Sequence, residues 1–281
     1  MTLVNEQKAI IPKASVAPGR MKRGLWSTLS FPLNRWAKKY HYQLEPYDTP
    51  ERREQGLILV LPGIEGESFF NHDVMHGLID AGLPYAIEHE DWTTKRIINY
   101  LYHLRGWKRN VTEAERIVAK ILAYQQEYPG RPVHLVGHSG GGAMSILVLE
   151  RLPEQNPVES VVLLGPALSR HYDLTVALRR VGGKVWNFYS YLDWFFLILG
   201  TSVMGTLDGR HHASAGALGF LPPKNASPDV QELYATKLRE VGYQWRMLRS
   251  VNFGGHFGCV NRLFIEEWVA PLLATGIPEA V

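Results

Sequence analysis

The segment from residue 133 to 149 constrains the fold most, because a turn rich in glycine joins two apolar runs there. The sequence is VHLV, then GHSGGG, then AMSILVL. The first run has the character of a buried strand, and the last run suits a helix. Ser139 lies between them, with Gly137 and Gly141 two positions away on either side. A serine on a strained turn needs such small neighbours, because a Cβ there would collide with the strand or the helix. The segment therefore predicts a tight strand-to-helix turn with Ser139 at its apex.

Short apolar runs alternate with helix-length segments along most of the chain. The runs that we expect to form strands are 40–46, 56–62, 85–89, 133–136, 158–164, 184–189 and 245–251. The helical segments between them are 68–81, 112–128, 141–152 and 228–241. Strands that alternate with helices in one chain form a mainly parallel sheet with helices on both faces. We therefore predict an α/β fold with a central sheet of about eight strands.

Composition excludes several other classes of protein. The 281 residues are 46% hydrophobic and 20% charged, which is ordinary for a folded globular chain. The net charge of +3 is too small to indicate a nucleic-acid partner. Cys259 is the single cysteine, so no intramolecular disulfide can form, and we expect a cytoplasmic protein. The longest apolar stretch, 194–205, is too short to span a bilayer.

The first 35 residues form a basic and aromatic N-terminal extension, and we expect residues 36–281 to form a single domain. This arm contains six Lys and Arg residues against the lone acid Glu6. It is too polar at its start for a secretory signal. Residues 21–40 mix apolar and basic side chains, so one interpretation is a segment that contacts a membrane surface. We favour the other interpretation, in which its aromatic side chains pack on the domain, because Pro32 interrupts any continuous helix.

The motif Gly-x-Ser-x-Gly between a strand and a helix resembles the nucleophile turn of the α/β-hydrolase superfamily. The resemblance extends from about residue 40 to residue 275, and it makes 133–136 the fifth strand of that fold. It implies a serine nucleophile after strand five, an acid after strand seven and a histidine after strand eight. Ser139, Asp193 and His256 occur in this order, after 133–136, 184–189 and 245–251. Asp208 remains an alternative to Asp193 as the acid.

The same resemblance implies an oxyanion hole made by two backbone N–H groups. One belongs to Gly140, the residue after the nucleophile. The other belongs to Ile64, which follows Gly63 in the loop after strand three. Glu65 and Glu67 lie in the same loop, and their negative charge would disfavour anionic acyl groups.

These residues predict a serine hydrolase of the esterase or lipase type, acting on a small-molecule or lipid-like carboxylic ester. The same machinery could serve a thioesterase, an amidase or peptidase, or an acyltransferase, and a non-catalytic binding protein on the same fold is a further alternative. The resemblance also implies a lid between strands six and seven. Only residues 166–183 are available for it, so we expect a short lid. Segments 92–110 and 194–243 either line the pocket or pack as ordinary structure. We expect no cofactor and no metal, because His72 and His76 share a helix face without an evident third ligand.

Overall fold

A single parallel sheet organises the molecule. The computed structural model describes residues 19–29, 47–66, 68–94, 106–193, 197 and 205–274. Within them, the strands follow the order β2-β1-β3-β4-β5-β6, and each neighbouring pair is parallel. The strands are β1 (Leu57–Leu61), β2 (Ala86–His89), β3 (Val133–His138), β4 (Ser160–Leu164), β5 (Val185–Tyr189) and β6 (Leu238–Gly242). The predicted α/β class is therefore confirmed, with six strands in the described residues rather than about eight.

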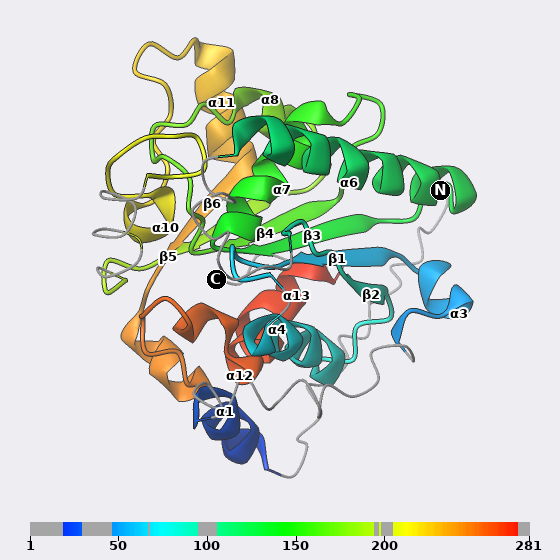
Figure 1. The fold of residues 1–281 in the computed structure, drawn as a ribbon, viewed down its shortest axis with the longest axis vertical. Helices are drawn as coiled ribbons and strands as arrows, with labels where there is room; N and C mark the ends of the chain where they lie inside the picture. Colours follow the sequence, from blue (N-terminus) through cyan, green and yellow to red (C-terminus); the bar gives the residue numbers. More distant parts are fainter. Residues whose placement is uncertain are drawn as a thin grey trace, which may run out of the picture.

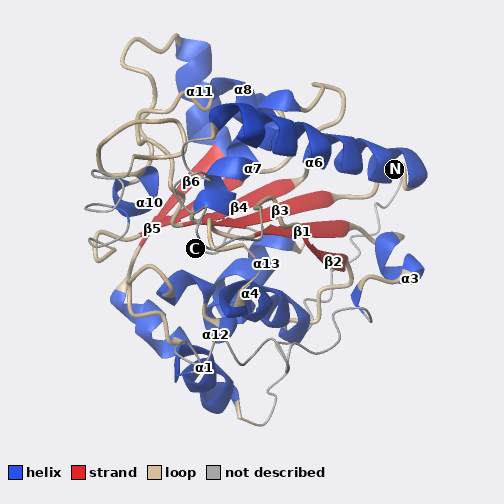
Figure 2. Ribbon diagram, in the orientation of Figure 1, coloured by secondary structure: helices blue, strands red, loops and turns tan. Residues whose placement is uncertain are grey.

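Helices cover both faces of this sheet (Figures 1 and 2). One face carries α6 (Trp107–Glu127), α7 (Gly140–Arg151), α8 (Thr175–Arg179) and α11 (Pro228–Lys237). The other carries α4 (Phe69–Asp80) and a helical segment made of α12 (Arg262–Phe264), the π turn η7 (Ile265–Val269) and α13 (Ala270–Leu273). The remaining elements are α1 (Arg20–Leu29), α3 (Pro50–Arg53), α10 (Ala215–Leu218) and the 3-10 turns η5 (Trp245–Ser250) and η6 (Gly258–Val260).

Strand β1 shows why the sequence folds into three layers. Leu57, Leu59 and Leu61 belong to the core under α6 and α7, whereas Ile58 and Val60 belong to the core under α4. Successive side chains of a strand point to opposite faces, so a continuous apolar run fits a strand that is covered on both sides. The prediction of a buried parallel strand at 56–62 is confirmed.

The strand order reverses beside β1, and a crevice is expected at the carboxyl ends of β1 and β3. The chain leaves β1 for β2 on one side, and later enters β3 on the other side. In open α/β sheets, ligands bind outside the carboxyl ends of the strands where the order changes in this way. The loop after β1 and the turn after β3 meet at that point, and these are the loops of Ile64 and Ser139.

The predicted strand at 245–251 is wrong, because these residues form the 3-10 turn η5. Only Met247 and Ser250 of η5 are buried, and this spacing of three matches the 3-10 repeat rather than a strand. The last strand is instead β6, which lies at the carboxyl end of the segment predicted as a helix over 228–241. β6 is an edge strand with Arg239 and Glu240 in it, so it lacks the apolar run that marks the central strands.

The other predicted helices are confirmed with small changes at their ends. Segment 68–81 corresponds to α4 and segment 141–152 to α7, while the helix predicted from 112 begins earlier, at Trp107 in α6. The predicted strand at 40–46, all of residues 95–105 and all of residues 194–204 except Leu197 lie outside the described residues. Between β4 and β5 the chain contains the short helix α8, in line with a short lid region. No helix in the described ranges is long and apolar enough to cross a bilayer.

Helix α1 packs against α12, on the outer side of the lower helical layer in Figure 1. Polar contacts fix it there: Arg23 forms an ion pair with Glu266 at 2.8 Å, and the Ser27 hydroxyl donates to Asp73 Oδ2 at 2.6 Å. A Cβ on Gly24 would lie 2.8 Å from Val251, so the helix approaches the body closely. Trp26 is 61% exposed, so the expectation that the aromatic side chains of the arm pack on the domain is wrong for this residue.

Burial beneath α1 raises the pKa of Asp73 to about 7, although the hydrogen bond from Ser27 acts in the opposite direction. Between pH 3.8, the ordinary pKa, and pH 7 the folded protein therefore binds more protons at this site than the unfolded chain. Stability contributed by this group is present at low pH and is lost as the pH rises through that window.

Replacing Asp73 by Asn should remove this pH dependence. Between pH 5 and pH 8 the wild-type free energy of unfolding should fall by roughly 2 to 3 kcal/mol more than that of the Asp73→Asn variant. Urea denaturation at both pH values measures the difference. Glu240, whose pKa burial also raises to about 7, is present in both proteins and cancels in the comparison. An equal fall in the free energy of unfolding of the two proteins would contradict the assignment of this pH dependence to Asp73.

Candidate active site

Ser139 occupies the turn between β3 and α7 in a conformation that few residues adopt. Its φ is +52° and its ψ is −115°, a strained backbone for a residue with a side chain. Two backbone hydrogen bonds tie it to residues at and after the end of β4. The Ser139 N–H donates to the carbonyl of Leu164 at 2.9 Å, and its own carbonyl accepts from the N–H of Ala167 at 3.0 Å. The end of β4 therefore fixes the turn from the side.

Glycines flank this turn because other backbone lies against them. A Cβ on Gly141 would collide with the carbonyl oxygens of Leu61 and Pro62, at the end of β1. A Cβ on Gly137 would clash with the carbonyl oxygen of Gly141, in the first turn of α7. Both contacts are shorter than a real Cβ tolerates, so α7 can begin this close to the sheet only with glycine at these positions.

Gly140 and Ile64, the two residues predicted to supply the oxyanion hole, lie beside each other. A Cβ on Gly140 would be 3.4 Å from the amide nitrogen of Ile64 and 3.0 Å from the ring of Trp92. Trp92 is fully buried, and its Nε1 donates to the carbonyl of Pro62 at 2.7 Å. Trp92 therefore supports the loop that carries Ile64. The positive end of the α7 dipole lies at the same place and favours negative charge.

His256 and Asp193 form a short hydrogen bond, with His256 Nδ1 2.6 Å from Asp193 Oδ2. Asp193 is 4% exposed and follows β5 by four residues, and its N–H donates to the carbonyl of Ser190 at 3.1 Å. The other carboxylate oxygen, Oδ1, is buried and has no hydrogen-bond partner among the described residues. A buried carboxylate held against one imidazole nitrogen fixes the orientation of the ring.

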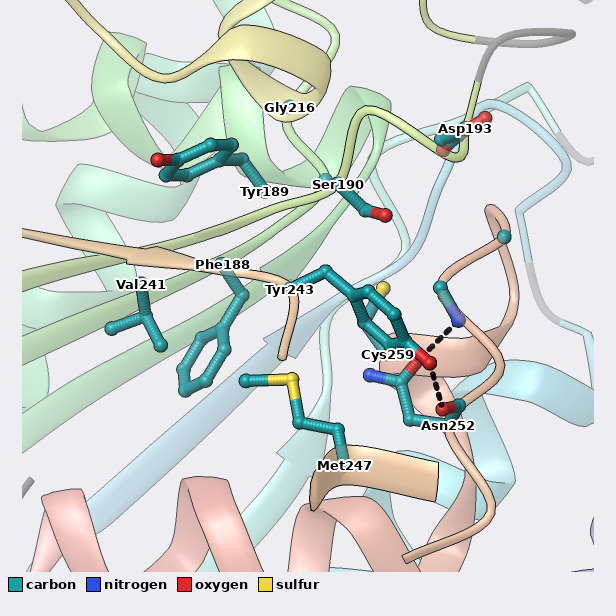
Figure 3. Close-up of a pocket in the computed structure, with 13 residues that line it drawn as sticks. Phe188, Tyr189, Ser190, Asp193, Gly216, Val241, Tyr243, Met247, Asn252 and Cys259 are labelled. Carbon is teal, nitrogen blue, oxygen red and sulfur yellow. Dashed lines mark hydrogen bonds between the residues drawn. The ribbon is translucent and has the colours of Figure 1, made fainter. Parts of the chain in front are cut away.

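The loop that carries His256 is fastened from within (Figure 3). The Tyr243 hydroxyl donates to the carbonyl of Asn252 at 3.2 Å, and the Asn252 side chain accepts from the N–H of Gly254 at 2.9 Å. Beneath the loop lies a cavity of about 20 Å³, which Asp193 and Cys259 help to line. Burial raises the pKa of the Cys259 thiol, and the charge of Asp193 raises it further, so this cysteine is a poor nucleophile.

His138 links the serine turn to the histidine loop, and our sequence analysis did not assign it a role. Its ring centroid lies 4.8 Å from that of His256, and its Nε2 lies 3.2 Å from the His256 carbonyl oxygen. The residue that precedes Ser139 therefore contacts the residue that carries the imidazole. The signal in the sequence was the second position of Gly-x-Ser-x-Gly, which is a histidine here.

Glu65 brings a negative charge to the same place. Its Oε1 lies 3.8 Å from His138 Nδ1, longer than a hydrogen bond. Burial alone would raise the pKa of Glu65, but the nearby imidazoles of His138 and His256 hold it below its ordinary value. Glu65 is therefore ionised at neutral pH. Glu67 lies outside the described residues.

Asp208 lies in a different set of contacts. Its Oδ1 accepts from the backbone N–H of Ser169 at 3.1 Å and from the Thr206 hydroxyl at 2.5 Å. It thus organises the loop after β4, while the carboxylate that meets His256 is that of Asp193. In the described part of the chain, no group of three or more His, Cys, Asp or Glu side chains is arranged to hold a metal ion, and His72 and His76 belong to none.

Substitution of Gly141 by Ala should destabilise the protein strongly, because backbone carbonyls cannot move away from the new Cβ. We expect a loss of roughly 2 to 4 kcal/mol in the free energy of unfolding. The control is Gly255→Ala, in the histidine loop, where a Cβ would meet no atom within 4 Å. Thermal or urea denaturation of both variants tests this, and a Gly141→Ala protein as stable as Gly255→Ala would refute the packing argument.

A family model described as serine aminopeptidase, S33, matches residues 52–194, about half of the chain. That range begins in α3 and ends one residue after Asp193, so it includes Ile64 and Ser139. The monoglyceride lipase of Mus musculus is 31% identical over 87 residues, which are 30% of this chain and 28% of that protein. The chain thus matches less than a third of the length of this relative.

Solved structures of similar shape are more distant in sequence. The poly(3-hydroxybutyrate) depolymerase of Bordetella parapertussis is 16% identical, with a TM-score of 0.48, over 83% of this chain and 84% of that one. A cutinase of Trichoderma reesei, solved with a phosphonate inhibitor, is 14% identical, with a TM-score of 0.38, over 60% of this chain and 76% of that one.

Proposed function

The chain belongs to the serine aminopeptidase S33 family of α/β hydrolases, and from this premise we propose that it is a serine esterase. Its substrate is a carboxylic ester with an apolar portion. Ser139 is the nucleophile, His256 the general base and acid, and Asp193 the carboxylate that orients His256. The observation that carries the proposal is the 2.6 Å contact of His256 Nδ1 with Asp193 Oδ2, on a loop that touches the residue beside Ser139.

In the first half of the reaction, Ser139 Oγ attacks the ester carbonyl carbon and its proton passes to His256 Nε2. Asp193 at Nδ1 stabilises the resulting imidazolium. The carbonyl oxygen becomes an oxyanion that accepts hydrogen bonds from the N–H groups of Ile64 and Gly140. The intermediate then collapses, the bond to the alcohol oxygen breaks, and the alcohol leaves with the proton from His256.

In the second half, water replaces the alcohol. His256 takes a proton from the water as its oxygen attacks the acyl carbon, and the same two N–H groups bind the second oxyanion. Breaking the bond to Ser139 Oγ releases the carboxylic acid, and His256 returns a proton to the serine. The strained turn holds Oγ at the carboxyl end of the sheet through both halves.

Support for an ester substrate comes from the relative, whose name describes a lipase. The family description favours a second candidate, an aminopeptidase, and one observation supports it: Glu65 supplies a negative charge that could pair with a substrate ammonium group. Comparing turnover of neutral acyl esters with that of aminoacyl amides separates these functions. Preferential cleavage of aminoacyl amides would favour the second candidate.

Ser139→Ala should lower ester hydrolysis by about 10³-fold or more, and Asp193→Asn should lower it more than Asp208→Asn. Steady-state hydrolysis of short-chain nitrophenyl esters measures these effects. Asp208→Asn is the matched control, because it changes the same chemical group outside the His256 contact. A larger loss for Asp208→Asn would show that the acid is wrongly assigned.

A fluorophosphonate probe, with mass spectrometry to locate the adduct, tests the nucleophile independently of substrate choice. Wild-type protein should carry the adduct on Ser139, and His256→Ala should prevent labelling. A folded wild-type protein that takes up no probe would favour a non-catalytic binding protein on this fold.

The charge of Glu65 should disfavour acyl chains that end in a carboxylate. Glu65→Gln removes this charge with little change in shape, so we expect the ratio of kcat/KM for an anionic ester to that for a neutral ester of equal length to rise about tenfold. The ratio cancels any general effect of the substitution on catalysis. An unchanged ratio would mean that Glu65 does not face the acyl group.

A further inference from the structure

Helix α1 is attached to the protein by its polar face. Arg20, Arg23, Gly24 and Ser27 recur at helical spacing and all face the body. Arg20 Nε donates to Glu267 at 2.6 Å, and the Asn261 side chain donates to the Gly24 carbonyl at 2.8 Å. A helix on the surface of a soluble domain ordinarily turns its apolar stripe inward, so α1 is mounted in the reverse orientation.

The apolar stripe of α1 consequently faces outward. Its side chains are large and 45% to 66% exposed: Met21, Leu25, Trp26 and Leu29. Three more exposed apolar side chains belong to η5 and the loop beyond it, which contact α1: Trp245, Leu248 and Phe253. Two contacts join these parts, since Arg20 donates to the carbonyl of Arg249 and Gly24 lies against Val251. We call these seven side chains the α1 surface.

The charged side chains that α1 and η5 themselves contribute are all basic. α1 contains Arg20, Lys22 and Arg23, η5 contains Arg246 and Arg249, and neither element contains an acidic residue. Arg20 and Arg23 are paired with Glu267 and Glu266, whereas Lys22, Arg246 and Arg249 are exposed beside the apolar side chains. Segments that lie in the interface of an anionic bilayer typically combine exposed Trp and Leu side chains with neighbouring Lys and Arg.

The α1 surface also borders a pocket that reaches His256. This pocket has a volume of about 290 Å³ and is lined by Ser27 and Thr28 of α1, by Phe70 of α4, and by Phe253, His256 and Phe257. Most of its lining is apolar. The pocket therefore places residues of α1 and His256 on the walls of one cavity, next to the α1 surface.

We propose that the α1 surface docks the protein on an anionic phospholipid bilayer, with Trp26 and Leu25 inserted among the acyl chains and Lys22, Arg246 and Arg249 at the headgroups. The polar anchors on the other face of α1 hold the helix to the protein while it is docked. The docking itself follows from the surface alone, while its use, supplying a lipid-like ester to the pocket at His256, rests on the proposed esterase function.

Cosedimentation of the full-length chain with vesicles tests this. The probes are vesicles of phosphatidylcholine alone and of phosphatidylcholine with phosphatidylserine at about 3:1. Wild-type protein should bind the mixed vesicles more tightly than the neutral ones, and added salt should weaken the binding. Leu25→Ser and Trp26→Ser should each lower the partition coefficient about tenfold or more, while hydrolysis of a soluble short-chain ester stays unchanged.

Trp107→Ser is the matched control, because Trp107 is a 43% exposed tryptophan at the start of α6, a helix on the opposite side of the sheet (Figure 1). It should bind vesicles like wild type. Failure of wild-type protein to bind mixed vesicles, equal weakening by Trp107→Ser, or equal binding to neutral and mixed vesicles would each overturn the proposal. A dimer that Trp26→Ser converts to monomer, without vesicle binding, would assign the surface to a second copy.

The two proposals fail in distinguishable ways. Ser139→Ala should bind vesicles like wild type, because Ser139 lies outside the α1 surface. Hydrolysis of soluble esters without vesicle binding would reject the docking surface and leave the esterase. Vesicle binding that depends on Trp26, without hydrolysis of any ester, would reject the esterase and leave the docking surface.

Discussion

The close approach of helix α7 to the end of strand β1 is the contact on which the rest of the site depends. Gly141 lies directly against the carbonyls of Leu61 and Pro62, so the helix starts almost on top of the neighbouring strand. That short distance forces the chain to turn sharply at Ser139, which accounts for its positive φ. It also brings Gly140 beside Ile64. The absence of a Cβ at one glycine thus fixes both the backbone of the turn and the neighbouring position of these two residues.

The loop that carries His256 is longer than the serine turn, and more contacts are needed to fix it. From the end of β6 the chain passes through η5 before it reaches His256, and a loop of this length must be fixed by its own hydrogen bonds. Tyr243 and Asn252 supply them within the loop, and His138 supplies a contact from the serine turn. Asp193 contributes a short bond from a buried position. The strained turn at Ser139 thus faces a histidine loop whose position is fixed by contacts from several elements.

How far the sequence predicts this structure depends on where each element lies in the sheet. β1 and β3 are buried on both faces; β1 is apolar throughout, and β3 is apolar apart from His134, Gly137 and His138, so both are predictable as buried strands. β6 is an edge strand, where Arg239 and Glu240 suit a helix as well as a strand, and it was missed. Contacts between distant parts, such as those of Glu65 and Asp73, leave no local pattern at all. The prediction of Asp193 and His256 was affected less by the error at β6. Both residues lie in loops, and their order after Ser139 does not change when the preceding element is a turn instead of a strand.

Helix α1 shows why amphipathic character alone does not reveal which face of a helix is buried. Its sequence separates apolar from polar side chains, and the usual inference is that the apolar side packs inward. Here the inward position is decided by complementary groups on the body: Glu266, Glu267, Asp73 and Asn261 all offer partners to the polar side. Small residues at Gly24 and Ser27 then let the backbone approach Val251 and Leu263. Because several ion pairs and hydrogen bonds hold the polar side of α1 to the body, the outward apolar face has a fixed position on the protein.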